Sequence, residues 1–92
     1  MIKSFRHKGL KLFFETGSSK GINPEHGPKL ARILDRLDAS KSPADMDLPG
    51  YKLHALTGKK RHQWAVWVSG NWRVTFGFIG EDAVNIDYLD YH

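Results

Sequence analysis

From Tyr51 onward, strand-like segments alternate with short turns, and this pattern limits the possible folds more than any other feature of the chain. The segments are rich in β-branched and aromatic residues, and the connections between them are short enough for antiparallel hairpins. They cover Tyr51–Leu56, His62–Val68, Trp72–Ile79 and Ala83–Tyr88. The sequence therefore predicts a mostly antiparallel β-sheet in the second half of the chain.

The first half has helical periodicity instead. Leu10, Phe13 and Phe14 recur at helical spacing, and Gly17 is placed to end the helix. A first helix is therefore expected at about residues 7–16, after a short strand at residues 2–5.

A second helix is expected after Asn23, Pro24 and Glu25, which are typical of an N-cap, a first-turn proline and a first-turn acid. Its apolar residues follow the i, i+3, i+4, i+7 pattern of one buried face. They are Leu30, Ile33, Leu34 and Leu37. The proline-containing stretch of residues 40–50 is predicted to be a loop that joins the helices to the strands.

These elements predict an α+β fold in which two N-terminal helices cover one face of the sheet. At 92 residues the chain is expected to form a single domain, residues 1–92, with a compact core. That core is expected to be largely aromatic, and the second half of the chain is expected to carry most of it, because five large aromatic residues lie close together there. They are Trp64, Trp67, Trp72, Phe76 and Phe78.

The central hairpin has a register that side-chain alternation can predict. A three-residue loop of Ser69, Gly70 and Asn71 places the apolar residues of both strands on one face, whereas a two-residue turn separates them. We therefore favour the three-residue loop. The opposite, open face then presents Gln63, Trp67, Arg73 and Thr75, which is a plausible platform for a nucleobase and a phosphate.

Positive charge is concentrated near this hairpin. Residues 52–73 contain no acidic residue, and their cations are Lys52, Lys59, Lys60, Arg61 and Arg73. A second basic cluster lies in residues 3–11. Such patches attract polyphosphates, so we expect Lys52, Lys59, Lys60, Arg61 and Trp67 to bind RNA, although a basic patch is often only a solvated face.

Other features of composition concern the cellular compartment. No apolar run approaches the ~20 residues of a membrane span, and residues 1–11 lack the apolar stretch of a signal peptide. The chain also has no cysteine, which suits the cytoplasm and excludes disulfides and thiolate metal sites. We expect a cytoplasmic protein.

Acid and base groups at the end of the chain suggest a reaction. Cleavage of RNA without a metal requires a base for the 2′-hydroxyl proton, a cation for the phosphoryl oxygens and an acid for the leaving 5′-oxygen. Arg73 is the candidate phosphate clamp, because its guanidinium stays charged and presents a planar fork. His54, Asp90 and His92 are candidates for proton transfer, and Tyr91 for positioning, stacking or a minor proton role.

Each of these residues has a structural alternative. Arg73 can be an ordinary strand arginine, and His54 a hydrogen-bonded sheet histidine. Trp67 can pack under a loop or against a partner. His54, Asp90 and His92 are residue types that bind metals, but their spacing matches no recognised motif, so neither a metal nor a cofactor is expected.

Taken together, several short segments resemble the HigB branch of the RelE superfamily, the host-inhibition toxins of bacterial toxin–antitoxin pairs. The segments that carry the resemblance span nearly the whole chain. They are Met1–Phe5, His7–Lys11, Tyr51–His54 with Leu56 and Gly58, Asn71–Phe76 and Asp90–His92.

The resemblance implies a microbial RNase-like fold and ribosome-dependent cleavage of mRNA in the aminoacyl-tRNA site, which inhibits translation. The family's functional positions match His54, Arg73, Asp90, Tyr91 and His92. It also implies a HigA-type helix-turn-helix antitoxin that binds operator DNA together with the toxin.

The chain departs from the family where a basic residue often follows the first histidine by three positions. Thr57 stands there. Either Lys59 or Lys60 replaces that charge, or the mRNA contacts are weaker. A gyrase-targeting ParE-type toxin and a non-catalytic RNA-binding module are the alternative functions, and the residues leave open which group is the base and which the acid.

Overall fold

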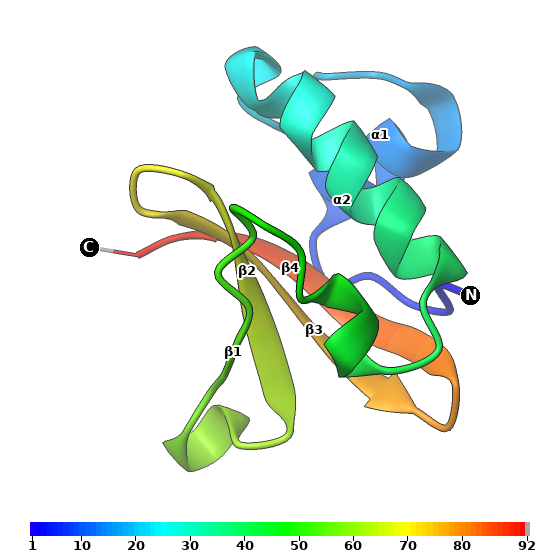
Figure 1. Ribbon diagram of the computed structural model, residues 1–92. Coiled ribbons are helices and arrows are strands. Elements are labelled where there is room, and N and C mark those ends of the chain that lie inside the picture. The colour runs from blue at the N-terminus through cyan, green and yellow to red at the C-terminus, as the bar shows by residue number, and fades with distance from the viewer. Residues whose placement is uncertain (92) are drawn as a thin grey trace.

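The computed structural model describes residues 1–91 and has two α-helices followed by four β-strands. The helices are α1 (Lys8–Thr16) and α2 (Gly27–Ala39). The strands are β1 (His54–Ala55), β2 (Gln63–Ser69), β3 (Trp72–Ile79) and β4 (Asp82–Asp90). Short 3-10 helices lie at η1 (Pro24–His26), η2 (Pro43–Met46) and η3 (Gly58–Lys60). This arrangement confirms the α+β class (Figure 1).

The strands form one antiparallel sheet in the order β1-β2-β3-β4. The N-terminal segment runs along the outer edge of β4, through parallel bridges of Ile2 with Ala83 and of Phe5 with Ile86. The expected strand at residues 2–5 is therefore reduced to two isolated bridges. These bridges cover backbone groups that an exposed edge strand would otherwise present.

The register of the central hairpin is confirmed, but its turn is tighter than expected. Trp64 pairs with Phe76 and Val66 with Val74, so these apolar residues share a face as the three-residue loop predicted. A bulge between Trp67 and Ser69 then absorbs one residue. A bulge of this kind lets a tight turn at residues 70–71 coexist with the pairing of a longer loop.

Other boundaries differ from the sequence prediction. β1 is only two residues long, because Lys52 has a positive φ of 51° that interrupts extended backbone before His54. Residues 40–50 are not only a loop, since η2 lies within them and its Met46 is fully buried. Asn23 accepts a hydrogen bond from the Glu25 N–H as predicted, but it caps η1 rather than α2.

Helix α1 follows its prediction closely. His7 is the N-cap, and its Nδ1 accepts a hydrogen bond from the Leu10 N–H at 3.0 Å. Gly17 ends the helix in the left-handed conformation with φ of 81°, which glycine adopts without a steric cost. In Figure 1, α1 lies beside α2, and its Leu10 is fully buried in the same cluster as residues of α2 and the sheet.

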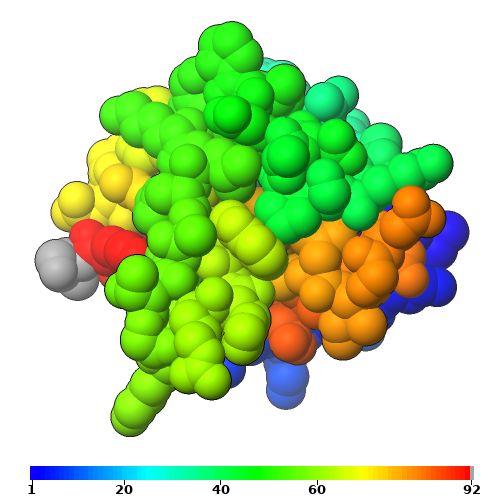
Figure 2. All heavy atoms as spheres, turned by 60° about the horizontal axis from the view of Figure 1, so that its bottom comes forward, coloured from blue at the N-terminus to red at the C-terminus, as the bar shows by residue number. Residues whose placement is uncertain are grey.

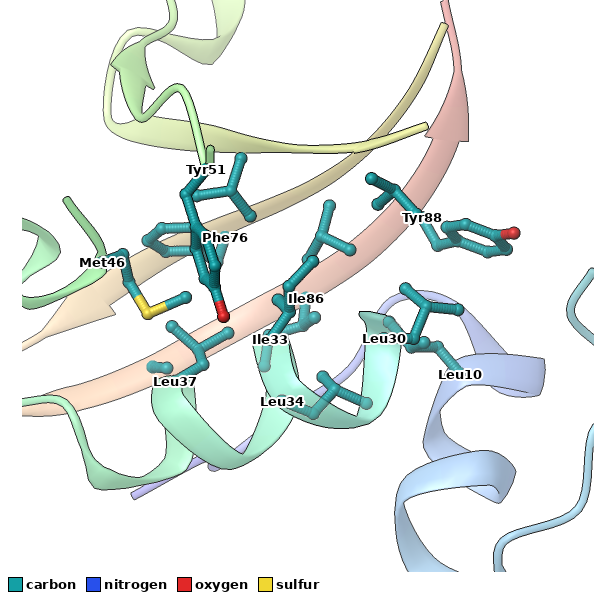
Figure 3. Packing of buried hydrophobic residues seen from close by; sticks show 14 of the residues in the cluster. Leu10, Leu30, Ile33, Leu34, Leu37, Met46, Tyr51, Phe76, Ile86 and Tyr88 are labelled. Atoms are coloured by element: carbon teal, nitrogen blue, oxygen red, sulfur yellow. The ribbon is translucent and has the colours of Figure 1, made fainter. Parts of the chain in front are cut away.

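The core lies between α2 and the helix-facing side of the sheet (Figure 3). All four predicted α2 residues, Leu30, Ile33, Leu34 and Leu37, are buried. They pack in one cluster with sheet residues such as Phe76 and Ile86. The expectation of a largely aromatic core was therefore wrong, because most of the buried cluster is aliphatic, and both halves of the chain contribute to it. Phe76 is fully buried, Trp64 and Trp72 are half-buried against the cluster, and Trp67 lies outside it.

Candidate active site

The face of the sheet away from α2 carries the candidate site. Directly paired residues share a face, and the ladder defines two neighbouring rows on this side. One row contains Trp67 and Arg73 with Leu89, and the next contains His54, Ala65, Thr75 and Asp87. Thr75 was expected to be displayed on this face, but it is almost fully buried. Small side chains in the second row thus form a floor between larger flanking residues.

Arg73 is held at the end of the central hairpin. Its Nη1 donates hydrogen bonds to the carbonyl oxygens of Gly70 at 2.9 Å and Trp72 at 3.0 Å. Within residues 1–91, Nη1 makes all of the guanidinium's hydrogen bonds, so the edge formed by Nε and Nη2 retains donors for an anion. An arginine oriented in this way can bind two phosphate oxygens at once.

Trp67 is fixed beside Arg73 by the same turn. Its indole N–H donates to the Gly70 carbonyl at 3.0 Å, and Lys52 Nζ lies 4.7 Å from the centre of the indole ring. The Trp67 backbone N–H also donates to the Tyr51 carbonyl at 2.7 Å, which brings Lys52 to this position. The structure therefore brings together Arg73, Trp67 and Lys52, three of the predicted site residues.

His54 is exposed on β1, in the row next to Arg73. Its Nδ1 lies 3.0 Å from the Lys52 carbonyl oxygen. Because a carbonyl can only accept, Nδ1 carries the proton of this hydrogen bond, and Nε2 of the neutral ring keeps its lone pair. The imidazole therefore has a geometry suited to accepting a proton at Nε2.

The end of β4 lies next to the turn of the central hairpin. Tyr91 donates its backbone N–H to the Asn71 carbonyl at 2.8 Å, and in Figure 2 the last described residues, in red, lie beside the yellow hairpin turn. Asp90 is exposed and pairs with Trp72, which places it on the opposite face from Arg73 at the rim of the sheet. His92, the remaining candidate, lies outside the described residues.

The predicted RNA-binding cations after β1 are all exposed. Lys59 and Lys60 belong to η3, and Arg61 follows it directly. Lys60 lines a hollow on the open face together with Gln63 of β2. Thr57, at the position where the family resemblance implied a basic residue, is the residue before η3. Of these cations, Lys60 brings positive charge to the open face of the sheet.

Sequence reasoning missed a polar cluster on the helix-facing side. His26 is buried, and its Nδ1 hydrogen bonds to the hydroxyl of Tyr88 at 2.5 Å. The Tyr88 ring stacks on Trp72 with centroids 4.5 Å apart. Burial raises the pKa of Tyr88 above 10.0, and the charge of Asp90 acts in the same direction, while a hydrogen bond with the Asn23 backbone opposes it. No local pattern could have revealed this pair, which is separated by 62 positions.

Residues 1–91 lack two features, a candidate metal-binding group and a helix that could span a membrane. They contain no group of three or more His, Cys, Asp or Glu side chains placed to hold a metal ion. Their helices include none that is both long and apolar enough to cross a membrane.

The geometry thus defines an open sheet face with a fixed guanidinium, an aromatic ring, an exposed imidazole and surrounding cations. Residues 3–92 match the family of HigB-like toxins, described as RelE-like toxins of the type II toxin–antitoxin system HigB. The chain belongs to this family, whose membership implies an antitoxin partner. Over 92 residues, all of both chains, it is 41% identical to a protein of Proteus vulgaris named Endoribonuclease HigB.

Proposed function

We propose that this chain is a ribosome-dependent endoribonuclease that cleaves mRNA in the ribosomal A site and thereby inhibits translation. The observation that carries the proposal is the Arg73 guanidinium, which is anchored through Nη1 while its other edge remains able to bind a phosphate. The Proteus vulgaris relative named Endoribonuclease HigB, with which the chain aligns over its full length, supports the same activity.

The reaction needs no metal or cofactor. The 2′-oxygen attacks the adjacent phosphorus, the bond from phosphorus to the 5′-oxygen breaks, and the products end in a 2′,3′-cyclic phosphate and a 5′-hydroxyl. His54 Nε2 takes the 2′-hydroxyl proton, since its Nδ1 is committed to the Lys52 carbonyl. Arg73 stabilises the charge that develops on the phosphoryl oxygens.

The leaving 5′-oxygen receives its proton from one of the last three residues of the sequence, Asp90, Tyr91 and His92, which supply a carboxylate, a phenol and an imidazole. The backbone hydrogen bond of Tyr91 to Asn71 supports this role, because it holds the end of β4 against the turn that anchors Arg73. In this proposal His54 is the proton acceptor, and the end of β4 contributes the proton donor.

The same surface binds the RNA backbone. Lys52, Lys59, Lys60 and Arg61 are exposed around the open face, and Trp67 offers its ring for stacking on a base. The ribosome supplies alignment that a small open site lacks, because holding the reactants in one geometry is worth ~7 to 11 kcal/mol. This accounts for cleavage on the ribosome rather than of free RNA.

Family membership supports the proposed partners and setting. Residues 1–92 form one toxin domain with the microbial RNase-like fold, in which the two N-terminal helices pack on the sheet. The antitoxin is a HigA-type helix-turn-helix protein that neutralises the toxin and carries the complex to operator DNA. The toxin itself acts in the cytoplasm on the 70S ribosome and mRNA.

The test compares one message in two states. Purified protein is added to translating ribosomes and to the same naked mRNA, and the new 5′ ends are mapped by primer extension. We expect cuts within A-site codons on ribosomes, little cleavage of naked RNA, and a rate that falls steeply with salt. Equal cleavage rates on ribosome-bound and naked mRNA would indicate a ribonuclease that does not need the ribosome. No cleavage of either form would exclude endoribonuclease activity.

A further inference from the structure

A polar hollow on the open face lies beside the candidate active site. Its volume is about 370 Å³, within the ~300 to 1,000 Å³ typical of ligand pockets. Its lining comes from the N-terminal segment, η3, β2 and β4. The lining residues are Arg6, Lys60, Gln63, Asn85, Asp87 and Leu89.

The hollow is continuous with the Arg73 row. Leu89 lines it and is also the direct partner of Arg73 across the β3–β4 ladder. Gln63 also lines the hollow, and it pairs across the β2–β3 ladder with Gly77, which is four residues along β3 from Arg73. At ~3.3 Å per residue this is about 13 Å, a distance that a few nucleotides of one strand can span.

Two side-chain amides are available in the hollow. Within residues 1–91, neither the Gln63 nor the Asn85 amide hydrogen bonds to another group. Asn85 has a left-handed φ of 55° at the irregularity in the β3–β4 ladder, and its backbone N–H donates to Ser4 Oγ at 2.9 Å. Such conformations persist where the surrounding structure fixes them, and they cluster at functional sites.

The charges of the hollow suit a nucleotide. Asp87 would repel a phosphate, but Arg6 Nε lies 3.6 Å from its carboxylate, and Arg6 itself is largely exposed. The other Asp87 oxygen accepts the Tyr88 N–H at 2.9 Å. Lys60 adds an unneutralised cation to the lining, since residues 1–91 give it no ion pair. The balance is positive at the rim and polar inside.

We propose that this hollow binds one nucleotide of the mRNA strand that is cleaved at Arg73, and that it reads the base. Gln63 and Asn85 hydrogen bond to the base edge, Leu89 contacts its face, and Arg6 and Lys60 bind the flanking phosphates. Amides suit this task because they both donate and accept, and unpaired RNA bases expose their hydrogen-bonding edges. The inference rests on the proposed endoribonuclease activity and adds a source of sequence preference.

The test maps cleavage sites across many messages on translating ribosomes for the wild type and Gln63→Glu. A carboxylate only accepts, so the base preferred at one fixed offset from the cut should change towards bases that present an amino group. We expect the original preference there to fall by roughly 5- to 150-fold. Asn85→Asp, on another strand, should change the same offset, which protects the test if one variant folds poorly.

Two controls make the result specific. Ser19→Asp adds a negative charge in the exposed loop between the helices, and its base preferences should match the wild type. Lys60→Ala should slow cleavage at all sites and reduce its salt dependence, whereas Lys20→Ala should not. If the wild type cleaves and both amide variants keep its base preferences, the proposed base-reading role of the hollow is wrong, whereas the endoribonuclease activity stands. No cleavage by the wild type would overturn the endoribonuclease itself.

Discussion

Replacing Arg73 by alanine separates catalysis from stability most clearly. The folded protein loses the two hydrogen bonds from Nη1 to the Gly70 and Trp72 carbonyls. Each such bond contributes a net ~0.5 to 1.5 kcal/mol, and the half-exposed setting favours the lower values. The unfolding free energy should therefore fall by about 1 to 2 kcal/mol, which lowers the melting temperature by roughly 4 to 16 °C in a domain of this size.

The expected loss of activity is much larger. Removing one preorganised donor from a developing negative charge typically slows the chemical step by about 10² to 10³-fold, or ~2.7 to 4 kcal/mol. Domains unfold with ~5 to 15 kcal/mol, so a loss of 1 to 2 kcal/mol leaves nearly every molecule folded. Unfolding therefore cannot account for a hundredfold decrease in rate.

Single-turnover cleavage on ribosomes at saturating protein measures the chemical step, and thermal melting measures folding. Arg73→Lys retains the charge without the fork and should recover only part of the rate. Arg61→Ala removes the same charge from the exposed segment after η3, and it should weaken binding while leaving the saturated rate unchanged. An Arg73→Ala protein that cleaves at the wild-type saturated rate would refute the phosphate clamp.

Three further predictions concern other parts of the molecule. Replacing both Tyr91 and His92 by alanine should abolish cleavage while the melting curve stays close to that of the wild type. A double variant that still cleaves would exclude Tyr91 and His92 as the proton donor. Trp67→Ala should weaken binding to the ribosome or mRNA by roughly 5- to 150-fold through lost stacking. It should lower the unfolding free energy less than Trp72→Ala does, since of these two residues only Trp72 packs against the core. Urea unfolding that shows Trp67→Ala to be the more destabilising variant would contradict this prediction. Burial raises the pKa of Tyr88, so the contribution of this residue to stability is complete below the ordinary pKa of 10.0 and is lost as pH rises through the folded-state pKa. The unfolding free energy should therefore fall above about pH 10. In Tyr88→Phe, the unfolding free energy should fall less steeply with pH.

The helices, the strands and the α+β class could be predicted from local patterns. The α2 stripe, the glycine cap at Gly17 and the extent of β3 all depend on residues close together in the chain. Helical spacing, a left-handed glycine and two-residue alternation are local properties. The pairing of Trp64 with Phe76 could be predicted for the same reason, because a short turn fixes the register of its strands.

Local patterns failed where contacts from distant segments decided the outcome. Met46 was assigned to a loop, yet it is fully buried against the core. The bulge near Val68 reconciles a tight turn with a longer register, and only the formed hairpin reveals it. The N-terminal bridges to β4 likewise required the sheet to exist first.

For the site, the sequence supplied the residue types and the tertiary structure decided their arrangement. Arg73 and Trp67 could be placed on one face by alternation, but not their shared acceptor, the Gly70 carbonyl. The hydrogen bond of His26 to Tyr88, and a hollow lined from both Arg6 and Asn85, join positions far apart in the chain. Such juxtapositions depend on how the sheet and helices pack, because side chains distant in sequence meet only when the whole core has formed.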